Sequence, residues 1–340
     1  MLALQAVTPN TLASAARVSL AEARKLVAAV HRGEPVRATS HVSRVAADAV
    51  RALGEVPALE VVSETPSGID PFVKYLLASG DARFETVRIP LEHPDRFTVC
   101  VSSQVGCALA CRFCATGRLG LARNLAAWEI VEQVRVVRAR LPRGRVHGVV
   151  FQGMGEPLAN LDAVLTAISV LTEPCAQGID ARAITVCTAG LPSGIRRLAA
   201  EAPRVRLAWS VSSAIADHRR AVMPIADRHA LPDVLAAVRD HARATGLSPM
   251  WAVTLLAGVN DSDDDARALA SLAADFARDA GVRPRLSLLD YNAIGEDDPF
   301  GRSPRMAAFR AVLADAGLAS HRRYSGGSDV GAACGQLALR

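Results

Sequence analysis

The chain has 340 residues, of which 50% are hydrophobic and 21% are charged, as in an ordinary globular protein with one large domain and a smaller appendage. Its formal net charge of +5 allows a nucleic-acid partner without requiring one. No apolar run is long enough to cross a bilayer, and the start lacks a basic region followed by an apolar stretch. We therefore expect neither a membrane-spanning segment nor a signal peptide, and we expect a cytoplasmic location.

The first 85 residues predict a small helical N-terminal module followed by a linking hairpin. Ser14–Arg32 and Val42–Leu53 each carry an apolar stripe at helical spacing, and the strand-like segments Leu59–Ser63 and Glu85–Pro90 follow. We interpret residues 1–85 as one unit and as a candidate RNA-contact surface. A solvated helix face explains its arginines equally well; those concerned are Arg17, Arg24, Arg32 and Arg37.

Residues 86–318 alternate strand and helix patterns, which predicts parallel strands with helices outside them. The expected fold is α/β, an incomplete TIM-like barrel of six βα units. The predicted strands are Phe97–Ser103, Val146–Gln152, Ala183–Thr188, Val205–Ser212, Met250–Leu256 and Arg285–Asp290. The predicted helices are Ala126–Leu141, Leu161–Leu171, Leu231–Thr245, Asp263–Asp279 and Pro304–Ala316. Residues 319–340 form a C-terminal tail that we expect to be loop-like, with one short ordered segment.

Three cysteines, Cys107, Cys111 and Cys114, form a CxxxCxxC array just after the first barrel strand. The array is one thiolate short of the four that normally hold an iron–sulfur cube, so one iron would stay open to a ligand. A zinc knuckle that lacks a ligand and three unrelated buried cysteines are the alternatives. Seven cysteines at uneven spacing do not resemble a secreted disulfide framework.

Other distinctive segments also fall where predicted strands end, which is where a parallel barrel gathers its functional groups. Within Gly153–Pro157, the glycines allow a ligand to approach the backbone closely, and Glu156 offers a carboxylate to an ammonium or to ribose hydroxyls. As an isolated motif, this segment is also explained as a simple turn. The remaining strand-end segments are Cys187–Gly190, Ser210–Ser213 and Asp290–Asn292.

Several motifs together resemble the RlmN/Cfr family of radical S-adenosylmethionine (radical SAM) RNA methyltransferases, which act on adenosine. The resemblance runs from about Glu85 to Leu337 and is weaker in the N-terminal module. The motifs are Cys100-Val-Ser-Ser-Gln-Val-Gly-Cys107, the cysteine array with Phe113, Arg123-Asn-Leu125, Gly153-Met-Gly-Glu-Pro157 and Ala332-Ala-Cys-Gly-Gln-Leu337. The resemblance implies methylation at carbon-2 of an adenosine in 23S rRNA, and also in tRNA.

The resemblance also implies a role for each functional cysteine. Cys107, Cys111 and Cys114 would hold a 4Fe–4S cluster, and its open iron would bind S-adenosylmethionine, which is cleaved to a 5′-deoxyadenosyl radical. Cys334 would carry the methyl group, and two S-adenosylmethionine molecules would be used per turnover. Cys100 would resolve the protein–RNA adduct, leaving a Cys100–Cys334 disulfide. Glu85 matches the family's proposed proton acceptor, a role for which Cys100 competes.

The cofactor contacts implied by the resemblance are Gly155, Glu156, Ser210 and Asn292, together with positions that depart from the family pattern. Cys187 stands where the family usually has serine, and Ser210-Val211-Ser212 stands where it reads Ser-Leu-His. Cysteine is a poorer hydrogen-bonding group than serine, and Ser212 is shorter than histidine. We therefore expect rearranged cofactor contacts at Cys187, Val211 and Ser212. Further expectations are an electron donor such as flavodoxin and a monomeric state.

Four alternatives to this function remain open at this point. The first is carbon-8 methylation of adenosine, as in the antibiotic-resistance branch of the family. The second is a radical SAM enzyme with a non-RNA substrate, which has no use for a methyl-carrier Cys334. The third is a non-enzymatic iron–sulfur regulator that binds RNA, and the fourth is a zinc-stabilised barrel.

Overall fold

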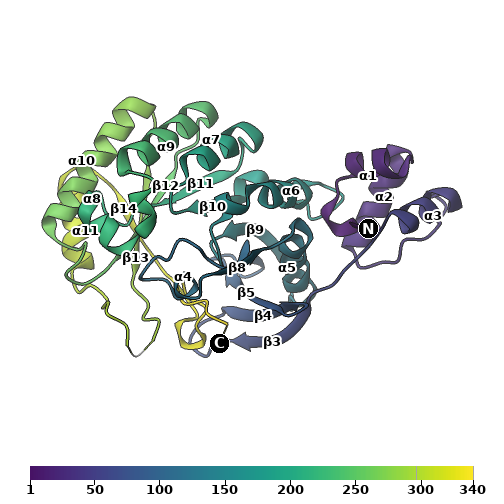
Figure 1. Cartoon of the computed structure of the whole chain (residues 1–340), viewed down its shortest axis with the longest axis horizontal. Helices are drawn as coiled ribbons and strands as arrows, with labels where there is room; N and C mark the ends of the chain where they lie inside the picture. Colours follow the sequence, from purple (N-terminus) through teal and green to yellow (C-terminus); the bar gives the residue numbers. More distant parts are fainter. Residues whose placement is uncertain (296, 340) are drawn as a thin grey trace.

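A computed structural model describes residues 1–295 and 297–339, and its centre is a ten-stranded mixed sheet (Figure 1). The six strands predicted for the barrel are all present and parallel, and a seventh, the short β14, extends them within the tail. The strands lie in the order β14 (Ser320–Arg323), β13 (Arg285–Asp290), β12 (Met250–Leu255), β11 (Arg206–Ser210), β10 (Ile184–Thr188), β9 (Arg145–Phe151), β6 (Arg96–Cys100), β5 (Ala82–Pro90), β4 (Val73–Ser79) and β3 (Glu60–Pro66). The predicted α/β barrel class is confirmed.

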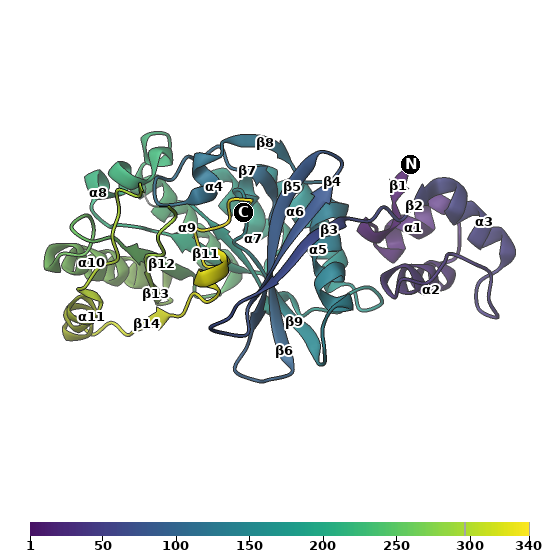
Figure 2. The ribbon, with the colours of Figure 1, turned by 90° about the horizontal axis from the view of Figure 1, so that it is seen from below.

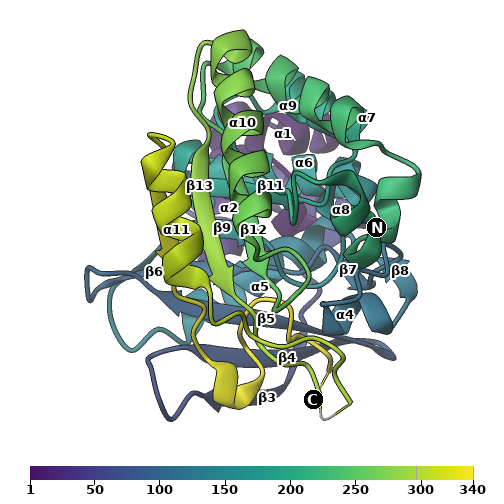
Figure 3. The ribbon, with the colours of Figure 1, turned by 90° about the vertical axis from the view of Figure 1, so that its left-hand side faces the viewer.

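Helices cover the outer side of the parallel strands, as the alternation of patterns predicts (Figure 3). Two of them, α7 and α8, follow β10 and β11 and are not among the helix ranges given from the sequence. The helices are α5 (Ala127–Ala139), α6 (Leu161–Thr172), α7 (Pro192–Glu201), α8 (Ala216–Val222), α9 (Leu231–Thr245), α10 (Asp263–Ala280) and α11 (Met306–Asp315). Short 3-10 helices are η2 (Pro157–Asn160), η3 (Ala181–Ala183), η4 (Pro224–Asp227) and η5 (Ser328–Val330).

Three antiparallel strands extend the sheet beyond β6. The sequence pattern predicts only two strand-like segments here, Leu59–Ser63 and Glu85–Pro90, whereas the structure has a third strand, β4, which lies between β3 and β5 and pairs with both. Nearly all of β4 is buried, so it lacks the alternation of apolar and polar residues by which a half-exposed strand is recognised. This three-strand extension holds the C-terminal tail.

The N-terminal helices form a separate small body at one end of the molecule (Figure 2), with a hydrophobic core of their own. The single apolar stripe Ser14–Arg32 is in fact two helices, because Arg17 adopts a left-handed conformation and Ser19 starts the second helix with a capping box. The elements are β1 (Leu2–Ala3), η1 (Leu4–Ala6), α1 (Pro9–Ala16), α2 (Leu20–His31), α3 (Arg44–Leu53) and β2 (Gly54–Glu55). Across residues 1–295 and 297–339, no helix is long and apolar enough to span a bilayer.

Strand register determines which side chains face the inside of the barrel. Residues paired across neighbouring parallel strands point to the same face, as do residues two apart along one strand. Cys187 pairs with Ala208, and Ser210 pairs with Ala252. Leu289 pairs with Arg323. Following these pairs, the side chains on the inner face are those of Cys100, Val150, Cys187, Ser210, Ala252, Leu289 and Arg323.

Candidate active site

Two neighbouring cavities occupy the carboxyl ends of the parallel strands. We call the first the barrel cavity; its walls include Cys107, Cys111, Cys114, Glu156, Cys187 and Ser210. We call the second the tail cavity; its walls include Val87, Cys100, Thr116, Arg323 and Tyr324. Cys334 lines both cavities. The strand ends therefore bring together most of the residues that the sequence singles out.

The three array cysteines lie on one loop that is bracketed by a small antiparallel ribbon, β7 (Gln104–Gly106) with β8 (Leu121–Asn124). The loop enters the four-residue helix α4 (Ala115–Arg118), and the Cys114 amide donates to the Cys111 carbonyl at 3.1 Å. All three cysteines line the barrel cavity. The loop thus brings three cysteines to one cavity.

This set of donors fits an iron–sulfur cluster. Burial raises the pKa of Cys107 to about 11 and raises the pKa values of Cys111 and Cys114 as well, so the thiolates need a nearby cation. In the part of the chain that the structure describes, no group of three His, Cys, Asp or Glu side chains is arranged to hold a single metal ion. A 4Fe–4S cube does not need three side chains to meet at a single ion, because each thiolate binds a separate iron.

Gly155 and Glu156 form the wall of the barrel cavity at the end of β9. Gly155 has φ +96°, and a Cβ there would lie 2.5 Å from the Gln104 side chain, so only glycine fits. Glu156 is 4% exposed, and its carboxylate accepts hydrogen bonds from the amides of Leu158 at 3.0 Å and Ala189 at 2.9 Å. Burial nevertheless raises the pKa of Glu156 to about 7. Such a carboxylate suits a ligand that brings a positive charge or hydroxyl donors.

A Gly155→Ala substitution tests the close approach at this turn. We expect a loss of about 2–3 kcal/mol in the free energy of unfolding, because the left-handed conformation and the contact with Gln104 are both unfavourable for alanine. The same variant should bind S-adenosylmethionine more weakly in equilibrium dialysis. Gly258→Ala is the matched control, since Gly258 also has positive φ (+70°) but no atom within 4 Å of the added Cβ. Equal effects in the two variants would contradict a role for the close approach.

The raised pKa of Glu156 predicts a pH dependence for cofactor binding. Only the carboxylate form accepts hydrogen bonds at both oxygens and attracts an ammonium, and the fraction of this form falls as the pH drops below about 7. The affinity for S-adenosylmethionine should therefore decrease from pH 7 to pH 5, approaching about tenfold per pH unit. Isothermal titration calorimetry at several pH values measures this. A Glu156→Gln variant should lose the dependence; an unchanged pH profile would exclude Glu156 as its source.

Arg219 is a structural residue of the site that the sequence pattern did not reveal. It lies on α8, is 1% exposed, and donates to the carbonyls of Ser210 at 2.7 Å and Ala189 at 2.6 Å, and to that of Val211. Burial lowers the pKa of Arg219 to about 10. The guanidinium ties the ends of β10 and β11 together beneath the cavity. An arginine in an amphipathic segment looks like a surface residue, so no local signal identifies it.

Arg219→Met should lower the free energy of unfolding by about 2–4 kcal/mol, because it leaves buried carbonyls at two strand ends without their donor. The midpoint of urea unfolding measures this effect. Arg220→Met is the control, since the neighbouring Arg220 is exposed and forms ion pairs with two exposed aspartates, Asp217 and Asp227. The control should lose less than about 1 kcal/mol. A similar loss in both variants would mean that Arg219 does not hold the strand ends.

The other predicted cofactor residues divide into two groups. Cys187, Ser210 and Ser212 line the barrel cavity, and the Ser212 hydroxyl contacts the Met223 sulfur at 2.9 Å. Val211 is fully buried and is not among the residues that line the barrel cavity. Asn292 contacts the tail instead: its amide donates to the Cys334 carbonyl at 3.3 Å and to the Ser325 hydroxyl at 3.4 Å.

Cys334 is held between the cavities by its backbone. Its amide donates to the Ser325 hydroxyl at 2.8 Å. The neighbouring Gly335 carbonyl accepts the Ala115 amide at 2.7 Å, and the Leu337 carbonyl accepts the Thr116 hydroxyl at 2.6 Å. The tail is therefore docked directly on the cysteine loop.

The β3–β4 connection holds the other side of the tail. The Asp329 carboxylate accepts the Ser67 hydroxyl at 2.8 Å and the Gly68 amide at 2.7 Å, and Asp70 accepts the Gly327 amide at 2.8 Å. Gly326 packs directly against the Phe72 ring, with no space for a Cβ. The antiparallel strands thus act as a support for the segment that carries Cys334.

Glu85 lies on β5 beneath the tail and is completely buried, but it is not among the residues that line either cavity. Its carboxylate forms an ion pair with the Lys74 ammonium at 3.1 Å and accepts the Leu339 amide at 3.1 Å. Cys100, at the end of β6, lines the tail cavity. The seven cysteines of the chain are unlinked, and Cys175 lies apart from the site, beside the N-terminal helices.

Comparison with known proteins agrees with this architecture. A profile of the Radical SAM superfamily matches residues 101–273. The crystal structure of a radical SAM methyltransferase from Sphaerobacter thermophilus matches with a TM-score of 0.88 and 34% sequence identity, covering 100% of both chains. The fold and its cysteine-lined cavity define a radical SAM protein.

Two curated relatives narrow this class. A probable RNA methyltransferase of Sorangium cellulosum is 58% identical over 97% of this chain and 90% of its own length. The dual-specificity RNA methyltransferase RlmN of Syntrophobacter fumaroxidans is 41% identical over 83% of this chain and 81% of its own length. The chain belongs to the RlmN/Cfr family of radical SAM RNA methyltransferases, and it is an S-adenosylmethionine-dependent enzyme.

Proposed function

We propose that the protein methylates carbon-2 of an adenosine in 23S rRNA, and also in tRNA, through a methyl group carried on Cys334. The observation that carries this proposal is the position of Cys334, which lines the barrel cavity together with the array cysteines and the tail cavity together with Cys100. A thiol in this position can take up a methyl group in the barrel cavity and have that group removed in the tail cavity. A non-RNA substrate would leave this arrangement without a purpose.

We assign the resident cofactor to the barrel cavity, where Cys107, Cys111 and Cys114 would hold three irons of a 4Fe–4S cluster. When bound, the cluster supplies the electron that splits S-adenosylmethionine to give a carbon radical. Glu156 and Ser210 face the same cavity and offer a carboxylate and a hydroxyl to the cofactor's polar groups.

The chain's own thiols then complete the transfer in our proposal. Cys334 Sγ would accept a methyl group from one S-adenosylmethionine and would then give up a hydrogen atom of that methyl group to the radical formed from a second. The resulting methylene radical would add to the adenine ring carbon, and the adduct would lose the ring proton and one electron, which returns to the electron-transfer system that supplied it. The Cys100 thiolate then attacks Cys334 Sγ: a Cys100–Cys334 disulfide forms, the sulfur–methylene bond breaks, and the released carbon takes up a proton to become the methyl group on adenine. An external reductant must open this disulfide before the next turnover.

Glu85 is our candidate for the group that takes the proton from the adenine ring, with Cys100 as its competitor. Lys74 and the Leu339 amide hold its carboxylate beneath the tail that carries Cys334. The N-terminal helices are a candidate RNA-contact surface, because Arg17, Arg24 and Arg37 are exposed on them or beside them. We further propose a cytoplasmic monomer that takes electrons from a donor such as flavodoxin.

Mass spectrometry of RNA from a strain that lacks the gene tests this function. We expect the loss of 2-methyladenosine from 23S rRNA, with restoration by the wild-type gene. Loss of 8-methyladenosine instead would assign the protein to the carbon-8 branch. Unchanged levels of both would exclude both sites of methylation. Reconstituted protein with transcribed rRNA fragments then locates the modified nucleotide.

A further inference from the structure

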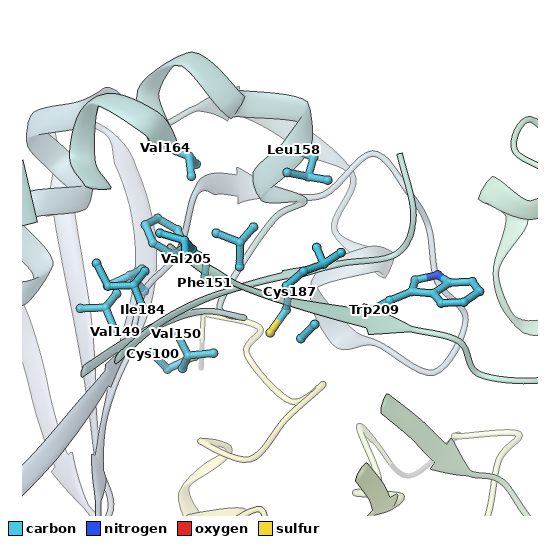
Figure 4. Packing of buried hydrophobic residues seen from close by; sticks show 14 of the residues in the cluster. Cys100, Val149, Val150, Phe151, Leu158, Val164, Ile184, Cys187, Val205 and Trp209 are labelled. Atoms are coloured by element: carbon cyan, nitrogen blue, oxygen red, sulfur yellow. The ribbon is translucent and has the colours of Figure 1, made fainter. Parts of the chain in front are cut away.

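Cys187 belongs to a cluster of three thiols around one guanidinium. Cys100, Cys187, Cys334 and Arg323 interact electrostatically across the boundary between the two cavities. Burial alone would lower the pKa of Arg323, but the sulfurs of Cys334, Cys187 and Cys100 raise it above its ordinary value. Figure 4 shows the Cys187 sulfur pointing toward the C-terminal tail, away from Leu158.

The sheet prevents two of these thiols from pairing with each other. Cys100 pairs with Val150 on β9, and Val150 pairs with Thr185 on β10, so β6 and β10 are separated by two strand spacings. Two spacings are about 9.6 Å, whereas a disulfide needs Cα atoms closer than about 7 Å. Cys100 and Cys187 nevertheless face the same side of the sheet, because Cys187 lies two residues beyond Thr185.

Cys334 does not have this restriction, because it lies on the tail rather than on a strand. It shares the barrel cavity with Cys187 and the tail cavity with Cys100. Cys334 is therefore the central thiol, with one partner on each side. Arg323, which also lines the tail cavity, stabilises the negative charge that any of the three develops as a thiolate.

We propose that Cys187 is a third redox thiol of this site and forms a disulfide with Cys334 by exchange with the Cys100–Cys334 disulfide. The Cys187 thiolate attacks Cys334 Sγ, a Cys187–Cys334 bond forms, and Cys100 leaves as a thiolate that takes up a proton. The exchange changes no net oxidation state. The source of the first disulfide rests on the proposed function, but any low-molecular-weight disulfide produces the same link.

The new link has a consequence for the barrel cavity. Cys187 and Cys334 are both part of its walls, alongside Glu156 and Ser210. A disulfide between them crosses the space that we assign to S-adenosylmethionine. The oxidised enzyme is then unable to bind its cofactor until a thiol reductant opens the link, so cofactor binding is coupled to the redox state of the cell.

Disulfide mapping of cluster-loaded, full-length protein tests this proposal without RNA or turnover. The protein is treated anaerobically with oxidised glutathione, its free thiols are blocked, and its peptides are analysed without reduction. We expect both Cys100–Cys334 and Cys187–Cys334 links in the wild type. Cys100→Ser should retain only the second link, Cys187→Ser only the first, and Cys175→Ser should match the wild type. In the Cys100→Ser/Cys187→Ser protein, Cys334 should carry glutathione.

Two further measurements test the proposal: the pH dependence of disulfide formation and the effect of the disulfide on S-adenosylmethionine binding. Burial raises the pKa of Cys187 to about 12, so the Cys187–Cys334 link should form about tenfold faster per pH unit between pH 7 and 9. Oxidised Cys100→Ser protein should lose S-adenosylmethionine binding in equilibrium dialysis and regain it with dithiothreitol. Wild-type protein that forms only the Cys100–Cys334 link at pH 9, or a Cys100→Ser protein whose Cys334 carries only glutathione, would overturn the proposal. Loss of RNA methylation alone has no bearing on it.

Discussion

A Cys334→Ser enzyme is expected to form no methyladenosine, with a decrease of at least about 10³-fold in the rate of RNA methylation. Serine keeps the size and backbone contacts of this position, but its hydroxyl cannot take and release a methyl group as a thiolate does. Mass spectrometry of rRNA incubated with reconstituted enzyme measures the rate. Iron content should be unchanged, because Cys334 lies outside the array.

Cys175→Ser is the matched control for this experiment, because Cys175 lies beside the N-terminal helices and outside both cavities. It should methylate RNA at the wild-type rate. A Cys334→Ser enzyme that retains methylation within about tenfold of the wild type would show that the methyl group reaches RNA by another route.

Cys111→Ser is expected to lose the cluster. A serine hydroxyl is a poor ligand for iron, and the remaining two cysteines cannot hold a cube. Iron content after anaerobic reconstitution should fall to background, together with the visible absorption of the cluster and the production of 5′-deoxyadenosine. The effect on methylation should be as complete as that of Cys334→Ser.

The two variants separate two steps of the reaction. Cys111→Ser should be defective in both cofactor cleavage and methylation, whereas Cys334→Ser should keep its iron. Iron bound at the wild-type level by Cys111→Ser would remove Cys111 from the ligand set. Circular dichroism shows whether either protein has lost its fold.

The barrel could be predicted from the sequence because its strands and helices alternate and each carries a clear period. Ile184–Thr188 and Leu231–Thr245 have bounds within a residue or so of the predicted ones. The array and the Gly155–Glu156 turn were also visible, since their chemistry depends on residues close together in the chain. The residues of each feature are neighbours in the sequence, so both features can be recognised without knowledge of the fold.

Features that depend on distant contacts were not visible. Asp329 binds Ser67 and Gly68 across more than 260 residues of chain. Nothing near Asp329 or Ser67 indicates this contact, although it is one of the contacts that hold the tail. Arg219 is a similar case, because its burial depends on the strand ends of β10 and β11 coming together above α8.

One strand was also not recognisable from the sequence, because both of its faces are buried. Val73–Ser79 is a strand whose residues are almost all buried, so it shows no alternation and was not separated from its surroundings. As a result, this strand is absent from the elements that the sequence predicts. In the N-terminal helices, the apolar stripe continued through the break at Arg17–Ser19, because the two helices bury their apolar faces in one shared core.

A pulse–chase measurement tests the central claim, that the methyl group passes through Cys334. The enzyme is first incubated with S-adenosylmethionine labelled with carbon-13 in its methyl group, freed of excess cofactor, and then given RNA with unlabelled S-adenosylmethionine. We expect labelled methyladenosine in the first turnover, together with loss of the label from the Cys334 peptide. An unlabelled first product, with the label still on the protein or never bound to it, would show that the methyl group does not pass through Cys334.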